Sequence, residues 1–253
     1  MESPVIVSRR IAVLVDGDNT QPSLIEGILT ETTKYGLVAV RRVYGDWTEP
    51  SMKGWKDALN RLAIQPIQQF RYTVGKNATD SALIIDAMDI LYEGVVEGIC
   101  LVSSDSDYTR LATRIREKGL FVMGIGRKTT PRPFVNACEV FVYTENIAAE
   151  AEASRTTRGV RKASPSSQAP SEEAPSDALP ILKTAIETAM GDSDWANLGA
   201  VGNILRQNDP SFDPRSYGYR QLLQLVRAYP DSFEIRQERS RGSSRLVYVR
   251  LKD

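Results

Sequence analysis

Aspartates that follow predicted buried strands are the residues of this sequence best suited to chemistry. Asp16 ends the apolar run of residues 11–15, and Asp105 and Asp107 follow the apolar run of residues 99–102. In open α/β sheets, ligands bind beyond the carboxyl ends of the strands. Carboxylates gathered at that edge repel one another unless a positive charge joins them. Because Mg²⁺ and Mn²⁺ prefer oxygen ligands, we expect one of these ions to bind there.

A further aspartate, Asp80, begins an amphipathic helical stretch behind a glycine-led loop. It either compensates the helix dipole as an N-terminal acid or belongs to the site. In the same loop, Lys76 could bind a phosphate or lie exposed without a ligand. Asp86 follows six positions later, about 120° around the helix from Asp80. We therefore expect Asp86 to support the site or the fold instead of sharing a face with Asp80.

Polar neighbours of these aspartates have more than one interpretation. Asp18 and Asn19 could add oxygen ligands beside Asp16, or cap the helix that follows. Asp107 could bind a metal or cap its own helix. Ser103 could bond phosphate oxygens, orient the carboxylates or be an ordinary loop hydroxyl. The residue types alone leave these alternatives open.

Composition limits the classes of chemistry and location. The 253 residues are 42% hydrophobic and 25% charged with zero formal net charge, which is ordinary for a soluble globular protein. The chain has no histidine, which excludes His-based triads, imidazole bases and histidine zinc sites. Cys100 and Cys138 lie in apolar segments, as buried thiols of a reducing compartment do. Without an apolar run of membrane-spanning length or a signal-peptide core, we expect a cytoplasmic protein that does not bind membranes.

Alternating strand-like and helical patterns predict how the aspartates are positioned. Strands are expected at residues 11–15, 38–44, 65–68, 99–103, 120–125 and 140–143. Helices are expected at residues 21–35, 51–62, 79–93, 107–118 and 131–137. This alternation predicts an α/β domain whose parallel sheet carries helices on both faces.

The composition changes near residue 149, where apolar side chains become rare and serine and proline accumulate. We expect residues 148–178 to be a flexible linker between domains at 9–147 and 179–253. Three helical patterns followed by two alternating strands then predict a small winged helix-turn-helix domain. Their expected positions are residues 179–190, 197–208, 220–229, 233–236 and 246–251.

Arginines and tyrosines of this C-terminal domain are candidates for RNA contacts. They are Arg215, Tyr217, Tyr219 and Arg220 near the third helix, and Arg239, Arg241 and Arg245 in the hairpin. Arginine with interleaved tyrosine suits phosphate contact and base stacking. The tyrosines could equally pack the core, and the arginines could simply be solvated.

Several segments together resemble the NYN domain, the LabA-like branch of the PIN-like nuclease superfamily, over residues 9–147. They are the segments 16–19, 44–47, 76–87, 103–108, 124–126 and 137–139. The resemblance implies a PIN-like sheet and a ribonuclease site that uses Mg²⁺ or Mn²⁺. Its catalytic and metal-binding set would be Asp16, Asp80, Asp105 and Asp107, with Asn19 adjacent.

Residues 179–252, above all the segment 212–219, resemble an OST-HTH, or LOTUS, domain. This resemblance implies binding of RNA or of a protein partner, with guanine-rich RNA for some bacterial members. The two resemblances together predict a metal-dependent ribonuclease that hydrolyses RNA phosphodiester bonds beside a tethered RNA-binding domain.

Two other functions remain open. The first is a non-catalytic RNA-binding adaptor that keeps the nuclease fold. The second is an aspartyl-phosphate phosphatase, because residues 16–20 also fit the Asp-x-Asp-x-Thr opening of haloacid-dehalogenase-like enzymes. The remaining segments fit the nuclease pattern better, and no cap insertion is evident. The sequence does not settle whether the chain forms a homodimer.

Overall fold

A computed structural model describes residues 9–70, 78–159, 177–191, 193–239 and 245–252. The chain divides into two compact units, Met1–Gly159 and Val160–Asp253. Each unit has its own hydrophobic core and is described by itself.

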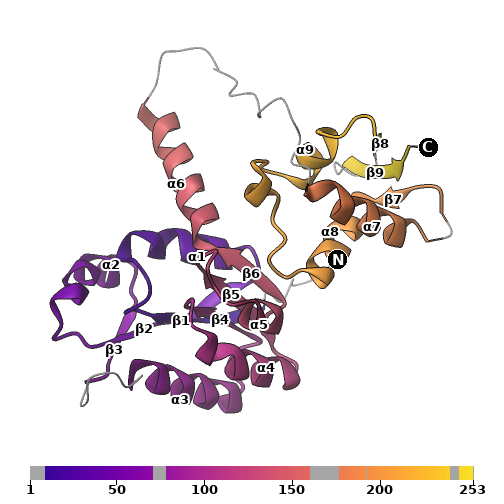
Figure 1. The fold of residues 1–253 in the computed structure, drawn as a ribbon. Coiled ribbons are helices and arrows are strands. Elements are labelled where there is room, and N and C mark those ends of the chain that lie inside the picture. The colour runs from indigo at the N-terminus through magenta and orange to yellow at the C-terminus, as the bar shows by residue number, and fades with distance from the viewer. Residues whose placement is uncertain (1–8, 71–77, 160–176, 192, 240–244, 253) are drawn as a thin grey trace, which may run out of the picture. The chain divides into compact units, whose positions relative to one another are not determined.

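The N-terminal unit is built on a six-stranded parallel sheet (Figure 1). Its strands are β1 (Arg10–Asp16), β2 (Leu37–Gly45), β3 (Gln65–Gln68), β4 (Gly98–Val102), β5 (Phe121–Gly126) and β6 (Val140–Tyr143). They lie in the order β3-β2-β1-β4-β5-β6. The chain order reverses between β1 and β4, and such switch points are where open α/β sheets bind ligands.

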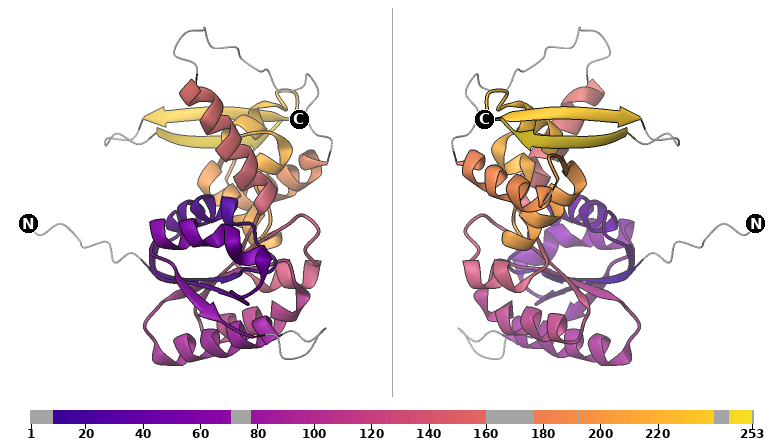
Figure 2. Two further views of the ribbon diagram at one scale, coloured as in Figure 1. Left: turned by 90° about the vertical axis from the view of Figure 1, so that its left-hand side faces the viewer. Right: turned by 90° about the vertical axis from the view of Figure 1, so that its right-hand side faces the viewer.

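Helices cover both faces of this sheet (Figure 2). One face carries η1 (Pro22–Leu24), α1 (Ile25–Thr33), η2 (Pro50–Trp55), α2 (Lys56–Arg61) and α6 (Thr144–Gly159). The other carries α3 (Ala78–Glu93), η3 (Ser106–Tyr108), α4 (Thr109–Glu117) and α5 (Arg132–Ala137). Alternate residues of β1 contribute to the hydrophobic cores on the two faces of the sheet, because successive side chains of a strand point to opposite faces. Val13 belongs to the same core as Ile28 of α1, whereas Leu14 belongs to the same core as Leu83 of α3.

The predicted parallel sheet with helices on both faces is confirmed, with small differences at the ends of elements. Gly94 and Gly119 end α3 and α4 with positive φ angles of 65° and 79°, as expected for glycine C-caps. The segment expected to be linker differs more. Its first part, through Gly159, continues helix α6, while residues 160–176 lie outside the described residues.

The C-terminal unit combines helices with a small antiparallel sheet. Its elements are α7 (Ala178–Met190), β7 (Ala196–Asn197), α8 (Leu198–Asn208), η4 (Pro214–Tyr217), α9 (Leu222–Arg227), β8 (Phe233–Arg239) and β9 (Arg245–Leu251). The strand order is β7-β9-β8. The expected winged helix-turn-helix is confirmed, with β7 as an additional two-residue strand. None of the described helices combines the length and apolar character needed to cross a bilayer.

Candidate metal centre

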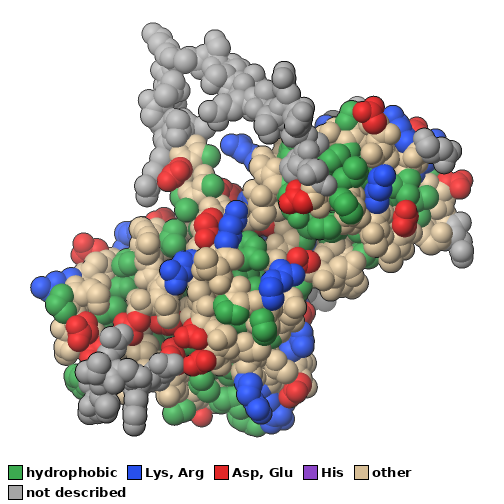
Figure 3. All heavy atoms as spheres, viewed as in Figure 1, with side chains coloured by type: hydrophobic (Ala, Val, Ile, Leu, Met, Phe, Trp, Pro, Cys, Tyr) green, Lys and Arg blue, Asp and Glu red, His purple; other side chains and the backbone are tan. Residues whose placement is uncertain are grey.

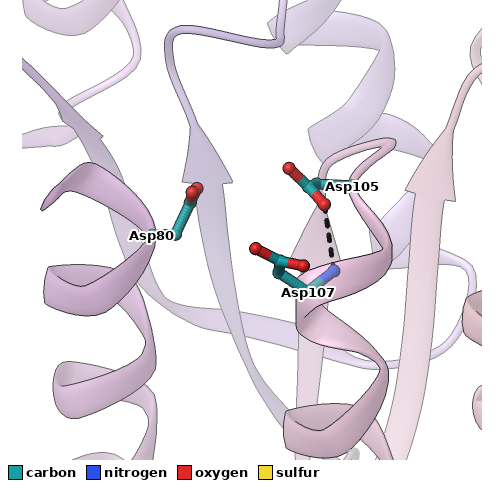
Figure 4. Close-up of side chains that lie close together, drawn as sticks. All are labelled: Asp80, Asp105 and Asp107. Atoms are coloured by element: carbon teal, nitrogen blue, oxygen red, sulfur yellow. Dashed lines mark hydrogen bonds between the residues drawn. The ribbon is translucent and has the colours of Figure 1, made fainter. Parts of the chain in front are cut away.

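Three carboxylates converge at the carboxyl end of the parallel sheet. Asp80, Asp105 and Asp107 each offer an oxygen, and these atoms lie within 4.8 Å of one another. Asp80 comes from the first turn of α3, and the other two come from the turn after β4 (Figure 4). Acidic side chains gather on this part of the surface, near the start of α3 (Figure 3). The site therefore joins two segments that are distant in the sequence.

The turn after β4 is organised by Asp105. This residue is the N-cap of η3, and its carboxylate accepts a hydrogen bond from the Asp107 backbone N at 2.9 Å. The backbone N of Asp105 in turn donates to Ser103 Oγ at 3.1 Å. The N-cap residue of η3 is thus Asp105, and that of the following helix α4 is Tyr108, so neither N-cap position belongs to Asp107.

Asp80 is held by a buried tyrosine and repelled by its neighbours. The Tyr108 hydroxyl, on a fully buried side chain, donates to Asp80 Oδ1 at 2.6 Å. Burial raises the pKa of the Asp80 carboxyl, and the negative charges of Asp105, Asp107 and Asp18 raise it further against the lowering effect of Tyr108. Oxygen donors whose charges destabilise one another fit a hard divalent cation such as Mg²⁺ or Mn²⁺.

Asp16 lies outside this group of three and is only 1% exposed. Its Oδ2 accepts from Asn19 Nδ2 at 2.6 Å and from Ser103 Oγ at 3.0 Å. Its Oδ1 accepts from the backbone N atoms of Asp18 and Asn19 at 3.2 and 3.3 Å. Burial raises the pKa of the Asp16 carboxyl, which the Asn19 and Ser103 hydrogen bonds oppose. Asp16 is outside the three-carboxylate group, so its direct contact with a metal stays a prediction.

The hydrogen bonding of Asp16 also bears on the phosphatase alternative. An aspartate that attacks phosphorus needs an accessible oxygen with a free lone pair. Both oxygens of Asp16 already accept two hydrogen bonds each, and the side chain is buried. The geometry suits an aspartate that organises the loop after β1 better than one that acts as a nucleophile.

The remaining candidates of this unit lie in different surroundings. Asp18 accepts from Thr79 Oγ1 at 3.0 Å, which ties the loop after β1 to the start of α3. The N-cap of η1 is Gln21, so neither Asp18 nor Asn19 caps that helix. Asp86 lies apart from the three-carboxylate group, where it accepts hydrogen bonds from Arg42 and Tyr44 of β2. Lys76 lies outside the described residues.

Sequence reasoning missed two residues that hold the site. Tyr108 and Thr79 each bond an aspartate, across 28 and 61 positions of the chain. Neither contact leaves a periodic signal, because the partners belong to different elements. The only available hint is position, since Tyr108 directly follows Asp107 and Thr79 directly precedes Asp80.

The C-terminal candidates are only partly surface residues. Arg215 makes an ion pair with Asp213, in which Nη2 and Nε donate to Oδ2 at 2.6 and 2.9 Å and Nε also donates to Oδ1 at 3.1 Å. Tyr219 is 8% exposed and belongs to the core, which leaves little ring surface for stacking. Tyr217 is half-buried against Phe212, with ring centroids 5.9 Å apart.

The other arginines of the set differ in how far they are described. Arg220 is exposed, on the turn before α9. Arg241 and the side chains of Arg239 and Arg245 lie outside the described residues. The contribution of these arginines to RNA binding stays a prediction.

Several solved structures of other proteins are similar to parts of this chain. Solved structures with similarity include a protein of unknown function from Vibrio parahaemolyticus, 21% identical, covering 56% of this chain and 96% of that chain with a TM-score of 0.47. An uncharacterized protein from Nitrosomonas europaea is 33% identical, covering 37% of this chain and 90% of that chain with a TM-score of 0.29. A protein from Chromobacterium violaceum is 38% identical, covering 33% of this chain and 87% of that chain with a TM-score of 0.25. No curated protein matches the chain.

Family models match the two units in turn. Residues 10–146 match the NYN domain, which belongs to the PIN-like nuclease superfamily. Residues 173–244 match the OST-HTH/LOTUS domain. The first match spans more than half of the chain, and both agree with the folds of the units that contain them. The chain therefore belongs to the NYN family and carries an OST-HTH/LOTUS domain after its NYN domain.

Proposed function

We propose that this protein is a cytoplasmic, divalent-metal-dependent ribonuclease. The observation that carries the proposal is the convergence of Asp80, Asp105 and Asp107 within 4.8 Å, at the switch point of an NYN sheet. Membership of the PIN-like nuclease superfamily supports hydrolysis of a phosphodiester bond. The OST-HTH/LOTUS domain supports RNA as the substrate.

Each residue of the centre has a role in this proposal. Asp80, Asp105 and Asp107 would hold Mg²⁺ or Mn²⁺, which when bound stabilises charge on phosphoryl oxygens and lowers the pKa of bound water. Tyr108 orients Asp80 through its hydroxyl. Ser103 links Asp16 to the turn that carries Asp105, because it donates to the first and accepts from the backbone of the second.

The C-terminal unit would bring the substrate to this centre. We propose that it binds RNA, including guanine-rich RNA, through exposed arginines such as Arg220. Because both units belong to one chain, RNA held by one is concentrated at the other. Phosphate contacts of this kind predict an RNA affinity that falls steeply as salt rises.

Cleavage of single-stranded RNA by the full chain with Mn²⁺ tests the proposal. Wild type should produce fragments with 5′-phosphate ends, and EDTA should abolish cleavage. Asp105→Asn should lower the rate by about 100-fold or more, because the bound ion supplies several kcal/mol of the stabilisation. The matched control is Asp57→Asn, an exposed aspartate on α2, which should cleave like wild type.

Two outcomes would count against a ribonuclease. Equal cleavage by wild type and Asp105→Asn would show that the activity does not come from this centre. RNA binding without Mn²⁺-dependent cleavage, over many RNA sequences, would instead favour the adaptor function.

A further inference from the structure

A small pocket lies on the same edge of the sheet, and two of its lining residues, Asn19 and Ser103, donate hydrogen bonds to Asp16. It has a volume of about 100 Å³ and is open at the ends of β4 and β5. Its buried wall is apolar and includes Val102 and Ile125, with Leu24 of η1 partly buried beside them. No acidic side chain is among the described residues that line it. The pocket is therefore suited to a neutral or anionic group with an apolar part.

The pocket shares residues with the candidate metal centre. Asn19 and Ser103 line it, and both donate to Asp16 Oδ2, at 2.6 and 3.0 Å. Ser103 also accepts from the Asp105 backbone. A group held in this pocket would therefore contact side chains that bond Asp16 and the turn carrying Asp105. A single side chain, that of Ser103, therefore connects the pocket to the turn that carries Asp105.

Three other lining residues have unused hydrogen-bonding capacity. The side chains of Thr20, Gln21 and Arg127 make no hydrogen bond or ion pair in the part of the chain that the structure describes. Gln21 does not use its amide to cap η1, although it is the N-cap residue. The amide offers a donor and an acceptor side by side, and Arg127 offers a positive charge. These groups are arranged around one opening, and none of them has a side-chain partner among the described residues.

We propose that this pocket receives one nucleobase of the bound RNA, which rests on the proposed ribonuclease function. Its volume is well below the roughly 300–1,000 Å³ of sites that enclose drug-sized ligands, so one ring fits and a whole nucleotide does not. An apolar wall with amide and hydroxyl groups at the rim is how proteins hold an unstacked RNA base. Arg127 then lies beside a neighbouring phosphate, which its exposed guanidinium neutralises.

A double-mutant cycle between protein and RNA tests the pocket without needing turnover. Affinities of the full chain are measured in Ca²⁺ for ten-nucleotide single-stranded RNAs, each with one nucleotide replaced by an abasic one. At one position, base removal should weaken wild-type binding by about 3- to 10-fold, as loss of one or two hydrogen bonds does. In Gln21→Ala this effect should disappear or shrink markedly, because contacting groups are not additive.

Two further variants make the result decisive. Thr20→Trp, which fills the pocket, should also remove the effect of the abasic nucleotide. Asn60→Ala, which deletes an exposed amide on α2, should keep it. RNA contacts of the C-terminal unit are the same in all variants, so they cancel in the comparison. The same abasic effect in wild type, Gln21→Ala and Thr20→Trp, or no effect at any position, would overturn the base pocket.

The outcome separates this proposal from the ribonuclease itself. If wild type does not cut these RNAs with Mn²⁺ but the cycle is non-additive, the base pocket stands and the ribonuclease fails. If wild type cuts them but the cycle is additive, the ribonuclease stands and the base pocket is overturned.

Discussion

The ionised carboxylate of Asp80 is held in unfavourable surroundings. It is partly buried, and it faces Asp105 and Asp107 across the centre. The raised pKa means that this carboxyl binds a proton more readily in the folded state than in the unfolded state. At neutral pH, well above the pKa of an unfolded aspartate, Asp80 therefore destabilises the metal-free fold. Functional sites often reduce the stability of the free protein in this way.

Asp80→Asn should consequently stabilise the metal-free protein. We expect a gain in Tm of about 3 °C at pH 7, with the Tyr108 hydrogen bond kept by the amide oxygen. The gain should fade below about pH 4, where the aspartate is protonated in both folded and unfolded states. Mn²⁺ should raise the Tm of wild type and not that of the variant. Thermal scans with and without Mn²⁺ measure both effects.

The matched control for this prediction is Asp89→Asn, on the exposed side of the same helix. It should change neither the Tm nor the response to Mn²⁺. A lower Tm for metal-free Asp80→Asn at pH 7 would contradict the like-charge repulsion inferred here.

Carboxylates were predictable from the sequence where a strand or helix boundary marks them. Asp105 and Asp107 follow a buried strand and Asp80 begins a helix, and the structure brings these three together. The sequence left open whether Ser103 orients a carboxylate, and it did not identify Asp16 as the partner, because the two residues lie 87 positions apart. Nor did it identify Tyr108 as the partner of Asp80. Local patterns show which residues end an element, but not which distant side chains meet there.

A polar contact attaches helix α3 to strand β2 of the sheet. Asp86 accepts hydrogen bonds from Arg42 and Tyr44, 44 and 42 positions earlier in β2. The pair of Arg42 and Asp86 is partly buried. The buried Nε of Arg42 has no partner among the described residues. Because α3 also supplies Asp80, we expect this contact to help hold the first turn of the helix in place at the centre.

Asp86→Ala should loosen that attachment. It leaves a partly buried guanidinium without its carboxylate, which should lower the free energy of unfolding by about 1–3 kcal/mol. The affinity for Mn²⁺ should fall by roughly 10-fold, as it does when residues that support metal ligands are removed. Urea denaturation and calorimetric titration measure the two effects. Asp89→Ala serves as the control on the same helix. Unchanged Mn²⁺ affinity in Asp86→Ala would separate the contact from the centre.

Elements were predictable where apolar periodicity is strong. The β-branched runs of the parallel sheet are buried on both faces, so their strands have a clear signal. Residues 149–159 lack that signal because they contain few large apolar side chains, yet they continue helix α6. Strand β7 is only two residues long and is defined by its pairing with β9. Such a strand exists because of its hydrogen bonds to a strand distant in the sequence, and its own residues show no pattern that would predict it.

The two units have separate cores, and both cysteines belong to the first. Cys100 and Cys138 are buried free thiols of the N-terminal unit. Burial raises the pKa of Cys100 to about 12 and also raises that of Cys138. The native thiols are therefore neutral and inaccessible at pH 8, whereas unfolded cysteines have a pKa near 8.5. Their alkylation reports opening of the N-terminal unit alone.

Mn²⁺ should stabilise the N-terminal unit of the full chain without stabilising the other. At 100 times its dissociation constant, a ligand of the folded state contributes about 2.7 kcal/mol, so alkylation through the unfolded state should slow by about 100-fold. Amide hydrogen exchange in α8, measured by mass spectrometry in the same solutions, should not change. Asp105→Asn should lose the slowing of alkylation. If exchange in α8 slowed equally with Mn²⁺, the two cores would unfold as one cooperative structure, and their separation would be wrong.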